Sequence, residues 1–250
     1  MTKRVRIDRL LVERGLFESR AKAQQAIAAG LVMADGAAVT KPAAEVSADA
    51  RLQAVPAHPW VSRGGVKLAA ALDHFAIEPA GRICLDVGAS TGGFTQVLLA
   101  RGARLIYAVD VGREQLHASL RGRPDVVAIE ATDIRKLEPA RLKEPPDLVT
   151  VDVSFIPLKL VLPAALALAR PAAEAVVLIK PQYEAGPDHV KKGIVRDPAI
   201  HEQVCADVTA LLTSLGWTVL GVIPSPIAGG DGNHEFLIAA SVAVQKPATC

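Results

Sequence analysis

The stretch LDVGASTGGFTQVLLA, residues 85–100, determines more of the fold than any other part of this chain. It begins as an apolar strand, passes through a turn that contains glycines, and continues as an apolar helix. In a parallel α/β sheet such a turn lies at the carboxyl edge of the sheet, where ligands bind. The amino terminus of the following helix favours an electronegative ligand group. The stretch therefore predicts an α/β domain with a ligand site at this edge.

The rest of the chain from Arg82 onward repeats the same alternation of strand-like and helix-like segments, which is typical of a mostly parallel α/β sheet. One helix is well marked, with Asp197 as its N-cap, Pro198 at its first position and Gly216 as its stop. The last two strands are joined by a Pro- and Gly-rich loop without helical periodicity, so we expect the last strand to be antiparallel. The predicted fold class is α/β, with a seven-stranded Rossmann-like sheet of strands 83–87, 105–110, 126–129, 148–152, 175–179, 218–223 and 235–240.

The charge of the chain is concentrated at its amino terminus. The net charge of the 250 residues is only +2, but residues 1–22 hold seven basic and three acidic side chains, whereas the remainder holds 21 basic and 23 acidic ones. A local positive field of this kind indicates an anionic polymer as the partner. Three cysteines without paired or CxxC spacing indicate neither a disulfide framework nor a zinc site, and favour a cytoplasmic protein. Neither a signal peptide nor a membrane span is predicted.

The first sixty residues predict a small α+β module. Ile7, Leu10 and Leu11 form an apolar stripe at helical spacing, and Ser19 is placed to cap a second helix over residues 19–29. Asp35-Gly36 lies between two short β-prone runs, which is a hairpin signal. A proline- and glycine-rich segment without periodicity, residues 54–65, then predicts an interdomain linker.

The pattern RIDRLLVERG…SRAKAQQAIAAGLVMADG…KP, over about residues 4–52, resembles the small RNA-binding domain named after small-subunit ribosomal protein S-four, also called the alpha-L motif. The resemblance implies that the two helices present basic side chains to structured RNA. Phosphate contacts of this kind position a protein on RNA without reading its sequence. The implied RNA-binding residues are Arg4, Arg6, Arg20, Lys22 and Lys41, and the expected domains are residues 1–53, a linker of residues 54–65, and residues 66–245.

The glycine turn departs from a dinucleotide fingerprint, because Ser90 stands where the middle glycine of G-x-G-x-x-G would be. The order D-x-G-x-x-x-G-G instead resembles motif I of S-adenosylmethionine-dependent methyltransferases. That resemblance implies S-adenosylmethionine as the cofactor, with Asp110 on its ribose hydroxyls and Asp133 on its adenine amino group. The other implied cofactor-binding residues are Asp86, Gly88, Thr91, Gly92, Gly93 and Phe94.

Four ionisable residues are expected at the same edge of the sheet. Asp152 and Lys180 follow two predicted strands, and Glu235 opens the reversed last strand, whose start lies at that edge. Lys67 begins the helix that leads into the domain. Lysine at a strand end most often extends to water, but Lys180 has three potential partners here. Pro181 directly after it ends the strand.

The set Lys67, Asp152, Lys180 and Glu235 matches the K-D-K-E tetrad of the FtsJ-like ribose 2′-O-methyltransferases. Together with VSRGGVKL, DVGASTGGFT, VDVSFI, IKPQYE and DGNHEFL in this order, the chain from about Arg4 to Ala240 resembles the TlyA family, historically also labelled hemolysin. The resemblance implies methylation of cytidine ribose 2′-hydroxyls in ribosomal RNA, with rRNA or ribosomal subunits as partners and without a metal.

In this scheme Lys180 is the base. A free lysine is protonated at neutral pH, so its pKa must be lowered, and burial and the neighbouring Lys67 both favour the neutral amine. Asp152 and Glu235 would orient the two amines and oppose the shift of the pKa. Phe155 and Tyr183 are candidates for stacking on a base, although core packing is the commoner role for each.

Three other functions fit parts of the sequence. A membrane-active cytolysin would need an exposed amphipathic or spanning segment, and none is visible. An RNA-binding assembly factor without catalysis is opposed by the intact tetrad and glycine turn. A nicotinamide-dependent oxidoreductase is opposed by the missing middle glycine.

Overall fold

A computed structural model describes residues 3–229 and 232–242 of the chain. The chain divides after Pro59 into two compact units, each with its own hydrophobic core. The predicted end of the second domain at residue 245 lies outside the described residues.

The first unit contains the two predicted helices and the predicted hairpin. The apolar stripe of the first helix is buried, and Ser19 Oγ accepts a hydrogen bond from the backbone N–H of Lys22 at 3.4 Å, so the predicted cap is confirmed. Asp35 and Gly36 both have positive φ (51° and 81°), the conformation of a two-residue type I′ hairpin turn. The elements are β1 (Arg4–Arg6), α1 (Ile7–Glu13), α2 (Arg20–Ala28), β2 (Val32–Ala34), β3 (Ala37–Ala38), β4 (Glu45–Ser47) and β5 (Leu52–Ala54).

Two small sheets hold this unit together. Strand β1 pairs with β4, and β2 pairs with both β3 and β5, all antiparallel. Ile7, Leu11, Ile27 and Val32 are fully buried between the helices and these strands. The pairings of β1 with β4 and of β2 with β5 were not predicted from the sequence.

The second unit contains the predicted seven-stranded sheet. Its strand order is β11-β12-β10-β9-β6-β7-β8, and β12 is antiparallel to both of its neighbours, β10 and β11. The prediction of a single reversed last strand is therefore confirmed. The strands are β6 (Ile83–Val87), β7 (Leu105–Val109), β8 (Val126–Ile129), β9 (Leu148–Val151), β10 (Glu174–Ile179), β11 (Trp217–Pro224) and β12 (Phe236–Val242).

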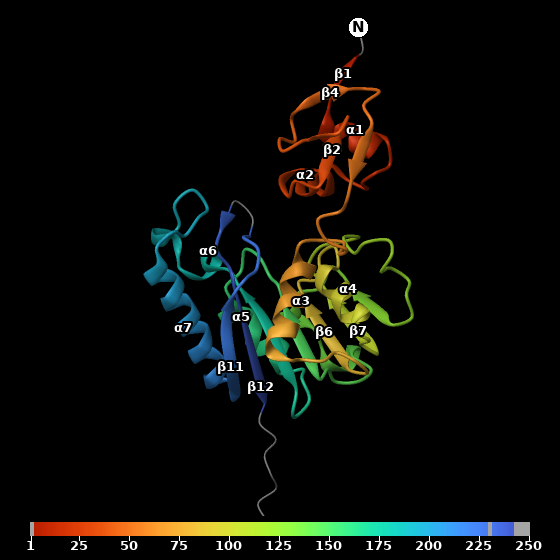
Figure 1. Cartoon of the computed structure of the whole chain (residues 1–250). Helices are drawn as coiled ribbons and strands as arrows, with labels where there is room; N and C mark the ends of the chain where they lie inside the picture. The colour runs from red at the N-terminus through yellow and green to blue at the C-terminus, as the bar shows by residue number, and fades with distance from the viewer. Residues whose placement is uncertain (1–2, 230–231, 243–250) are drawn as a thin grey trace, which may run out of the picture. The chain divides into compact units, whose positions relative to one another are not determined.

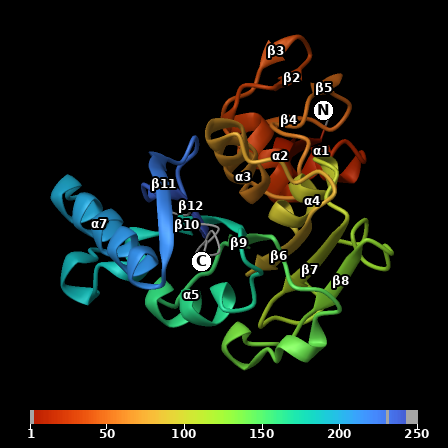
Figure 2. The same cartoon turned by 90° about the horizontal axis from the view of Figure 1, so that it is seen from below.

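Helices cover both faces of this sheet, as Figures 1 and 2 show. Leu68, Leu72 and Leu98 from α3 and α4 pack on one face, whereas Val161 and Val208 from α5 and α7 pack on the other. Successive residues of β6 and β10 alternate between the two cores, because strand side chains point alternately to opposite faces. The helices are α3 (Gly64–Phe75), α4 (Gly93–Ala100), α5 (Leu158–Leu166), α6 (Pro181–Glu184) and α7 (Pro198–Ser214), with short 3-10 turns at Ile134–Lys136, Pro139–Arg141 and Pro187–His189.

Two predictions are confirmed here: Pro181 ends the strand before it, and Asp197 is the N-cap of the long helix. Strand β10 ends at Ile179, and α6 begins at Pro181, so Lys180 lies between them. Asp197 caps α7 through a hydrogen bond from the backbone N–H of Ala199 (3.0 Å). Because α7 connects β10 to β11, which runs in the same direction, the helix begins on the side of the sheet at which β10 ends.

Candidate active site

The glycine turn after β6 packs tightly against the end of β9. Gly88 has φ +82°, and a Cβ atom built on it would lie 2.2 Å from the backbone carbonyl oxygen of Asp152. Only glycine allows this approach with this backbone conformation. The turn and Asp152 thus form one continuous wall at the carboxyl edge of the sheet.

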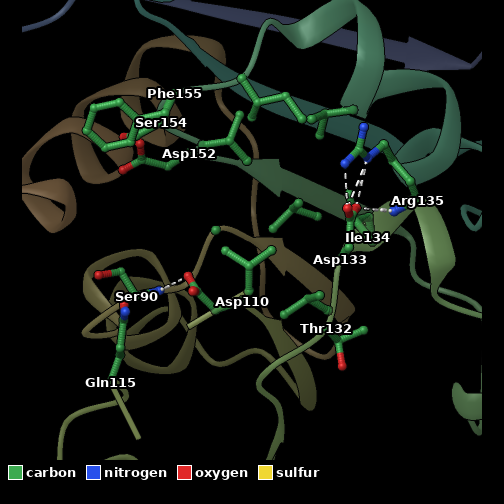
Figure 3. A pocket seen from close by; sticks show the side chains of 17 residues that line it. Ser90, Asp110, Gln115, Thr132, Asp133, Ile134, Arg135, Asp152, Ser154 and Phe155 are labelled. Carbon is green, nitrogen blue, oxygen red and sulfur yellow. Dashed lines mark hydrogen bonds and ion pairs between the residues drawn. The ribbon is translucent and has the colours of Figure 1, made fainter. Parts of the chain in front are cut away.

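A cavity of about 470 Å³, here called the Asp110 chamber, opens at this edge (Figure 3). Asp110 follows β7, and its carboxylate accepts hydrogen bonds from the backbone N–H groups of Ser90 (2.8 Å) and Gly112 (2.7 Å). These bonds hold the carboxylate at the cavity wall and tie the glycine turn to the end of the second strand. Val111, which lines the same cavity, has 73% of its surface exposed.

Asp133, the second predicted acid, also lines the Asp110 chamber, and it is bound by Arg135. The Arg135 guanidinium contacts both carboxylate oxygens, with its Nη2 atom 2.6 Å from Oδ2 (Figure 3). This interaction lowers the pKa of Asp133 to about 2. The acid is ionised at neutral pH, with Arg135 as its partner.

The remaining predicted cofactor residues have different positions. Gly88 and Ser90 line the Asp110 chamber, and Gly93 and Phe94 line a smaller cavity beside it. Thr91 is exposed, and Gly92 packs against Leu116 and Leu120, so neither lines these cavities. Asp86 is fully buried below the turn, where its carboxylate accepts hydrogen bonds from the hydroxyls of Thr95 (2.6 Å) and Thr150 (3.1 Å).

Burial raises the pKa of Asp86 to about 7, although the two hydroxyls partly offset the effect. A carboxyl group with a raised folded-state pKa stabilises the fold fully below its unfolded pKa, near 4, and loses that contribution as the pH rises to about 7. The loss is about 1.4 kcal/mol per pH unit within this window. The side chain of Asp86→Asn cannot ionise, so this variant does not lose the contribution. The free energy of unfolding of the variant minus that of the wild type should therefore increase between pH 4 and pH 7.

Urea unfolding at several pH values, followed by tryptophan fluorescence, measures this difference, because both tryptophans, Trp60 and Trp217, belong to the second unit. The matched control is Asp73→Asn, which alters an acid with 60% of its side chain exposed. Parallel pH profiles for Asp86→Asn and the wild type would contradict the prediction.

The four tetrad residues form two ion pairs in a second cavity of about 460 Å³, here called the Lys180 chamber. Lys67 pairs with Glu235, and both side chains are almost completely buried. Lys180 Nζ lies 2.6 Å from Asp152 Oδ1 and donates a better aligned hydrogen bond to Ser154 Oγ at 2.9 Å. This chamber is lined by Lys67, Lys180 and Glu235. Asp152 does not line it but is paired with Lys180, which does.

A small polar cavity of about 170 Å³ joins the two chambers, and we call it the junction. It shares Gly88, Ser90, Asp152 and Ser154 with the Asp110 chamber and shares Ser154 and Lys180 with the Lys180 chamber. The Lys180 ammonium therefore lies where the two larger cavities meet.

Ser154 is a site residue that the sequence analysis did not identify. It lines all three cavities and binds Lys180 directly. Its signal in the sequence was its position two residues after Asp152, because polar residues that follow a strand end collect at the same sheet edge. Asn233 is a second site residue that the sequence did not predict, and it lines the Lys180 chamber. Its role depends on contacts with a loop 40 residues away, which local sequence does not indicate.

Phe155 contradicts the expectation of core packing. Its side chain has 88% of its surface exposed, its backbone has φ +64°, and its ring lies 5.0 Å from that of Tyr183. Both aromatic residues line the Lys180 chamber. An exposed aromatic ring on a non-glycine residue with left-handed backbone is costly and therefore suggests a functional role.

In the first unit, two of the predicted RNA-binding residues converge on a buried acid. Arg6 binds both oxygens of Asp8 (3.1 and 3.0 Å), and Arg20 and Gln24 donate to the same carboxylate at 2.8 and 2.9 Å. Asp8 is fully buried, and these bonds hold its pKa well below its usual range. The two guanidinium groups keep roughly two fifths to one half of their side-chain surface exposed.

The other three predicted RNA-binding residues lie on the surface of the same unit. Lys41 is exposed and lies beside Pro42, whose carbonyl accepts from the backbone N–H of Asp8. Arg4 donates to the carbonyl oxygen of Glu45 (2.5 Å), and Lys22 pairs with Glu18 (2.6 Å). The backbone at Lys41 is thus close to Asp8, which binds Arg6 and Arg20.

Two further classes of site were tested against the structure. Over residues 3–229 and 232–242, no helix is long and apolar enough to cross a membrane. Within the same ranges, no group of three or more His, Cys, Asp and Glu side chains is arranged to hold a metal ion.

A sheet of this strand order, with a glycine turn after its first strand and an acid after its second, defines the class of Rossmann-like methyltransferases. The FtsJ-like methyltransferase model matches residues 60–242, and the S4 domain model matches residues 5–52. The chain belongs to the TlyA family, in which an FtsJ-like methyltransferase domain follows an S4 domain.

Three relatives illustrate the similarity. The chain is 46% identical over 241 residues to the 16S/23S rRNA (cytidine-2'-O)-methyltransferase TlyA of Mycobacterium tuberculosis, covering 95% of this chain and 90% of that protein. It is 37% identical over 235 residues to hemolysin A of Brachyspira hyodysenteriae, with coverage of 93% and 98%. A solved structure of a Streptococcus thermophilus protein assigned as a hemolysin superposes with a TM-score of 0.77 at 40% identity, over 97% of this chain and 90% of the other.

Proposed function

We propose that this protein transfers a methyl group from S-adenosylmethionine to the ribose 2′-hydroxyl of a cytidine in ribosomal RNA. The observation that carries the proposal is the junction, in which the Lys180 ammonium group lies between two cavities of the size of small-ligand sites. One cavity would hold the methyl donor and the other the acceptor nucleotide. The names of the relatives agree with this chemistry.

The Asp110 chamber fits S-adenosylmethionine by its chemistry. A fixed carboxylate at the end of β7 can accept bonds from both ribose hydroxyls, and Val111 and Ile134 offer apolar surfaces for an adenine ring. When bound, the cofactor supplies an electrophilic methyl group on a sulfonium centre. Gly88 and Gly93 let the turn pack closely against Asp152 and Ser62, which fixes its backbone at the wall of the cavity.

Lys180 is proposed as the base: its ammonium group first releases a proton to solvent, and the neutral amine then takes the proton of the ribose hydroxyl. A 2′-hydroxyl is a weak nucleophile, and its oxygen needs a proton acceptor as the new bond to carbon forms and the bond between carbon and sulfur breaks. Lys180 donates to Ser154 Oγ and is paired with Asp152, so two neighbours hold its Nζ at the junction. Alignment of oxygen, carbon and sulfur supplies much of the remaining acceleration.

Lys67 and Glu235 are proposed to position the acceptor. Their buried ion pair forms a fixed wall of the Lys180 chamber, and its remaining hydrogen-bonding capacity can bind the ribose hydroxyls. The pair also places a second cation in the chamber that holds Lys180.

The first unit is proposed to bind structured rRNA, through Arg4, Arg6, Arg20, Lys22 and Lys41. Asp8 holds two of these guanidinium groups in fixed positions, so less side-chain entropy is lost when they contact phosphates. A function on ribosomes would also agree with the cytoplasmic location that the cysteine pattern favours.

Phe155 is proposed to stack on the base of the acceptor nucleotide. We expect Phe155→Ala to lower the rate of methyl transfer to rRNA roughly 10- to 100-fold, since stacking on an aromatic side chain contributes about 1–3 kcal/mol. Because Phe155 also lines the Asp110 chamber, transfer is measured at saturating S-adenosylmethionine. The control is Phe75→Ala, which removes a partly buried aromatic ring at the end of α3 that lines neither chamber. An unchanged transfer rate for Phe155→Ala would refute the stacking role.

The function is tested by incubating the full chain with tritium-labelled S-adenosylmethionine and 30S or 50S subunits that lack ribose methylation. The expected product is label in an alkali-resistant dinucleotide, because a methylated 2′-hydroxyl prevents cleavage of the next phosphodiester bond. Digestion to nucleosides should yield 2′-O-methylcytidine. Label in a base would refute ribose methylation, and cofactor binding without transfer to either subunit would favour an assembly factor.

A further inference from the structure

A basic hairpin, residues 190–196, forms part of the wall of the Lys180 chamber. The backbone N–H of Lys191 donates to the carbonyl of Ile194 (3.0 Å), and the N–H of Ile194 donates back to Lys191 (3.1 Å). The two residues of the turn, Lys192 and Gly193, both have positive φ (52° and 77°). A left-handed conformation is unfavourable for a lysine, and asparagine is the residue that usually occupies this position of such turns.

The base of this hairpin is anchored in the core of the second unit. The Asn233 side chain, only 3% exposed, donates to the carbonyl of Gly193 (2.9 Å) and accepts from the N–H of Val195 (3.3 Å). His201 Nε2 donates to the carbonyl of Val195 at 3.0 Å. Since Asn233 lies two residues before Glu235, the hairpin and the tetrad carboxylate are held by one short segment.

The cations of the hairpin point to a polyanion outside the chamber. Lys191, Lys192 and Arg196 are exposed, and none of them forms an ion pair with a described residue. The neighbouring Asp197 uses its carboxylate to cap α7. By contrast, several other basic residues of this unit have carboxylate partners, namely Arg82, Arg101, Arg104, Arg123 and Arg135.

We propose that the 190–196 hairpin binds the RNA phosphates that flank the target nucleotide. The inference rests on the proposed function. A nucleotide whose ribose enters the Lys180 chamber leaves its two adjoining phosphates at the chamber mouth, and Val190 and Gly193 belong to that chamber wall. Contacts of Lys191 and Lys192 with these phosphates position the strand and do not read its bases.

The test uses the full-length double variant Lys191→Gln/Lys192→Asn. Asparagine accepts the left-handed turn conformation, so the variant removes two charges and retains the hairpin. We expect KM for ribosomal subunits to rise about 10-fold, with kcat and the affinity for S-adenosylmethionine changed less than twofold. The slope of log Kd for rRNA against log salt should decrease by about 1.4, because two contacts to a single strand are lost.

The charge-matched control is Arg101→Gln/Lys143→Gln, which removes two cations at the opposite edge of the sheet. Arg101 follows α4 and is partly buried and paired with Asp73, whereas Lys143 precedes β9 and is exposed. A second variant, Lys191→Arg/Lys192→Arg, should retain the wild-type slope. The proposal is overturned if the hairpin variant has the same salt slope as the wild type. Because the slope is measured by rRNA binding, it tests the hairpin even if the wild type transfers no methyl group, which would be a failure of the proposed function instead.

Discussion

Replacing Lys180 by methionine is expected to reduce methyl transfer to ribosomal RNA by about 10²- to 10⁴-fold, the usual contribution of a general base. Methionine retains an unbranched side chain and lacks the amine, so the variant removes the proton acceptor together with its contacts to Asp152 and Ser154. Lys180 is 9% exposed, and its Nζ atom has Asp152 and Ser154 as partners. Binding of the cofactor and of rRNA should remain within about threefold of wild type, because neither depends on the proton acceptor.

Single-turnover transfer at saturating cofactor and rRNA measures this effect without contributions from product release. The control is Lys143→Met, which alters an exposed lysine that precedes β9 and is therefore remote from the junction. If Lys180→Met retained transfer within threefold of the control, the role of Lys180 would be limited to its contacts with Asp152 and Ser154. Another group would then have to accept the proton.

Replacing Gly88 by alanine is expected to abolish cofactor binding and transfer, and to destabilise the second unit by about 2–4 kcal/mol. The left-handed backbone contributes about 1 kcal/mol of this cost. The larger part comes from the new methyl group, which would lie 2.2 Å from the Asp152 carbonyl oxygen. Since both atoms belong to backbone segments that form the junction, relief of the contact must displace Asp152 or the turn.

The matched control is Gly81→Ala, because Gly81 has a similar φ of +73° and its built Cβ atom meets nothing within 4 Å. The control carries the conformational strain without the contact. Thermal unfolding with and without S-adenosylmethionine, together with calorimetric titration of the cofactor, compares the two variants. Equal stabilities and equal affinities would show that the approach of the turn to Asp152 is unimportant.

Most of the architecture of the second unit could be predicted from residue patterns alone. Apolar runs of four to six residues predicted all seven strands of the sheet, and the loop without helical periodicity before β12 predicted its reversal. These features are local, because strand length, turn residues and helix caps act over a few neighbouring residues. The edge at which Asp152, Lys180 and Glu235 meet also followed, since parallel strands end at one side of a sheet.

The pairing within the site was decided by tertiary structure. Lys67 and Glu235 are 168 residues apart, and nothing in their local sequence indicates which carboxylate binds which amine. The same holds for the Asn233 side chain, which holds the 190–196 hairpin, and for Asp8, whose partners Arg6 and Arg20 come from two elements. Long-range hydrogen bonds depend on where the ends of separate elements converge.

The chain by itself thus determined the elements, their order and the edge that carries the chemistry, because backbone conformation responds to nearby residues. Only the folded structure decided the direction of the side chains at that edge. Phe155 was expected in the core, yet its backbone leaves the strand geometry with φ +64° and turns the ring outward. Asp86 was expected at the ligand, yet it is hydrogen-bonded below the turn. Phe155 lies beyond the end of β9, where the two-residue alternation of a strand no longer applies. Asp86 lies inside β6, and the hydroxyls of Thr95 and Thr150, from a neighbouring helix and strand, hold its carboxylate there.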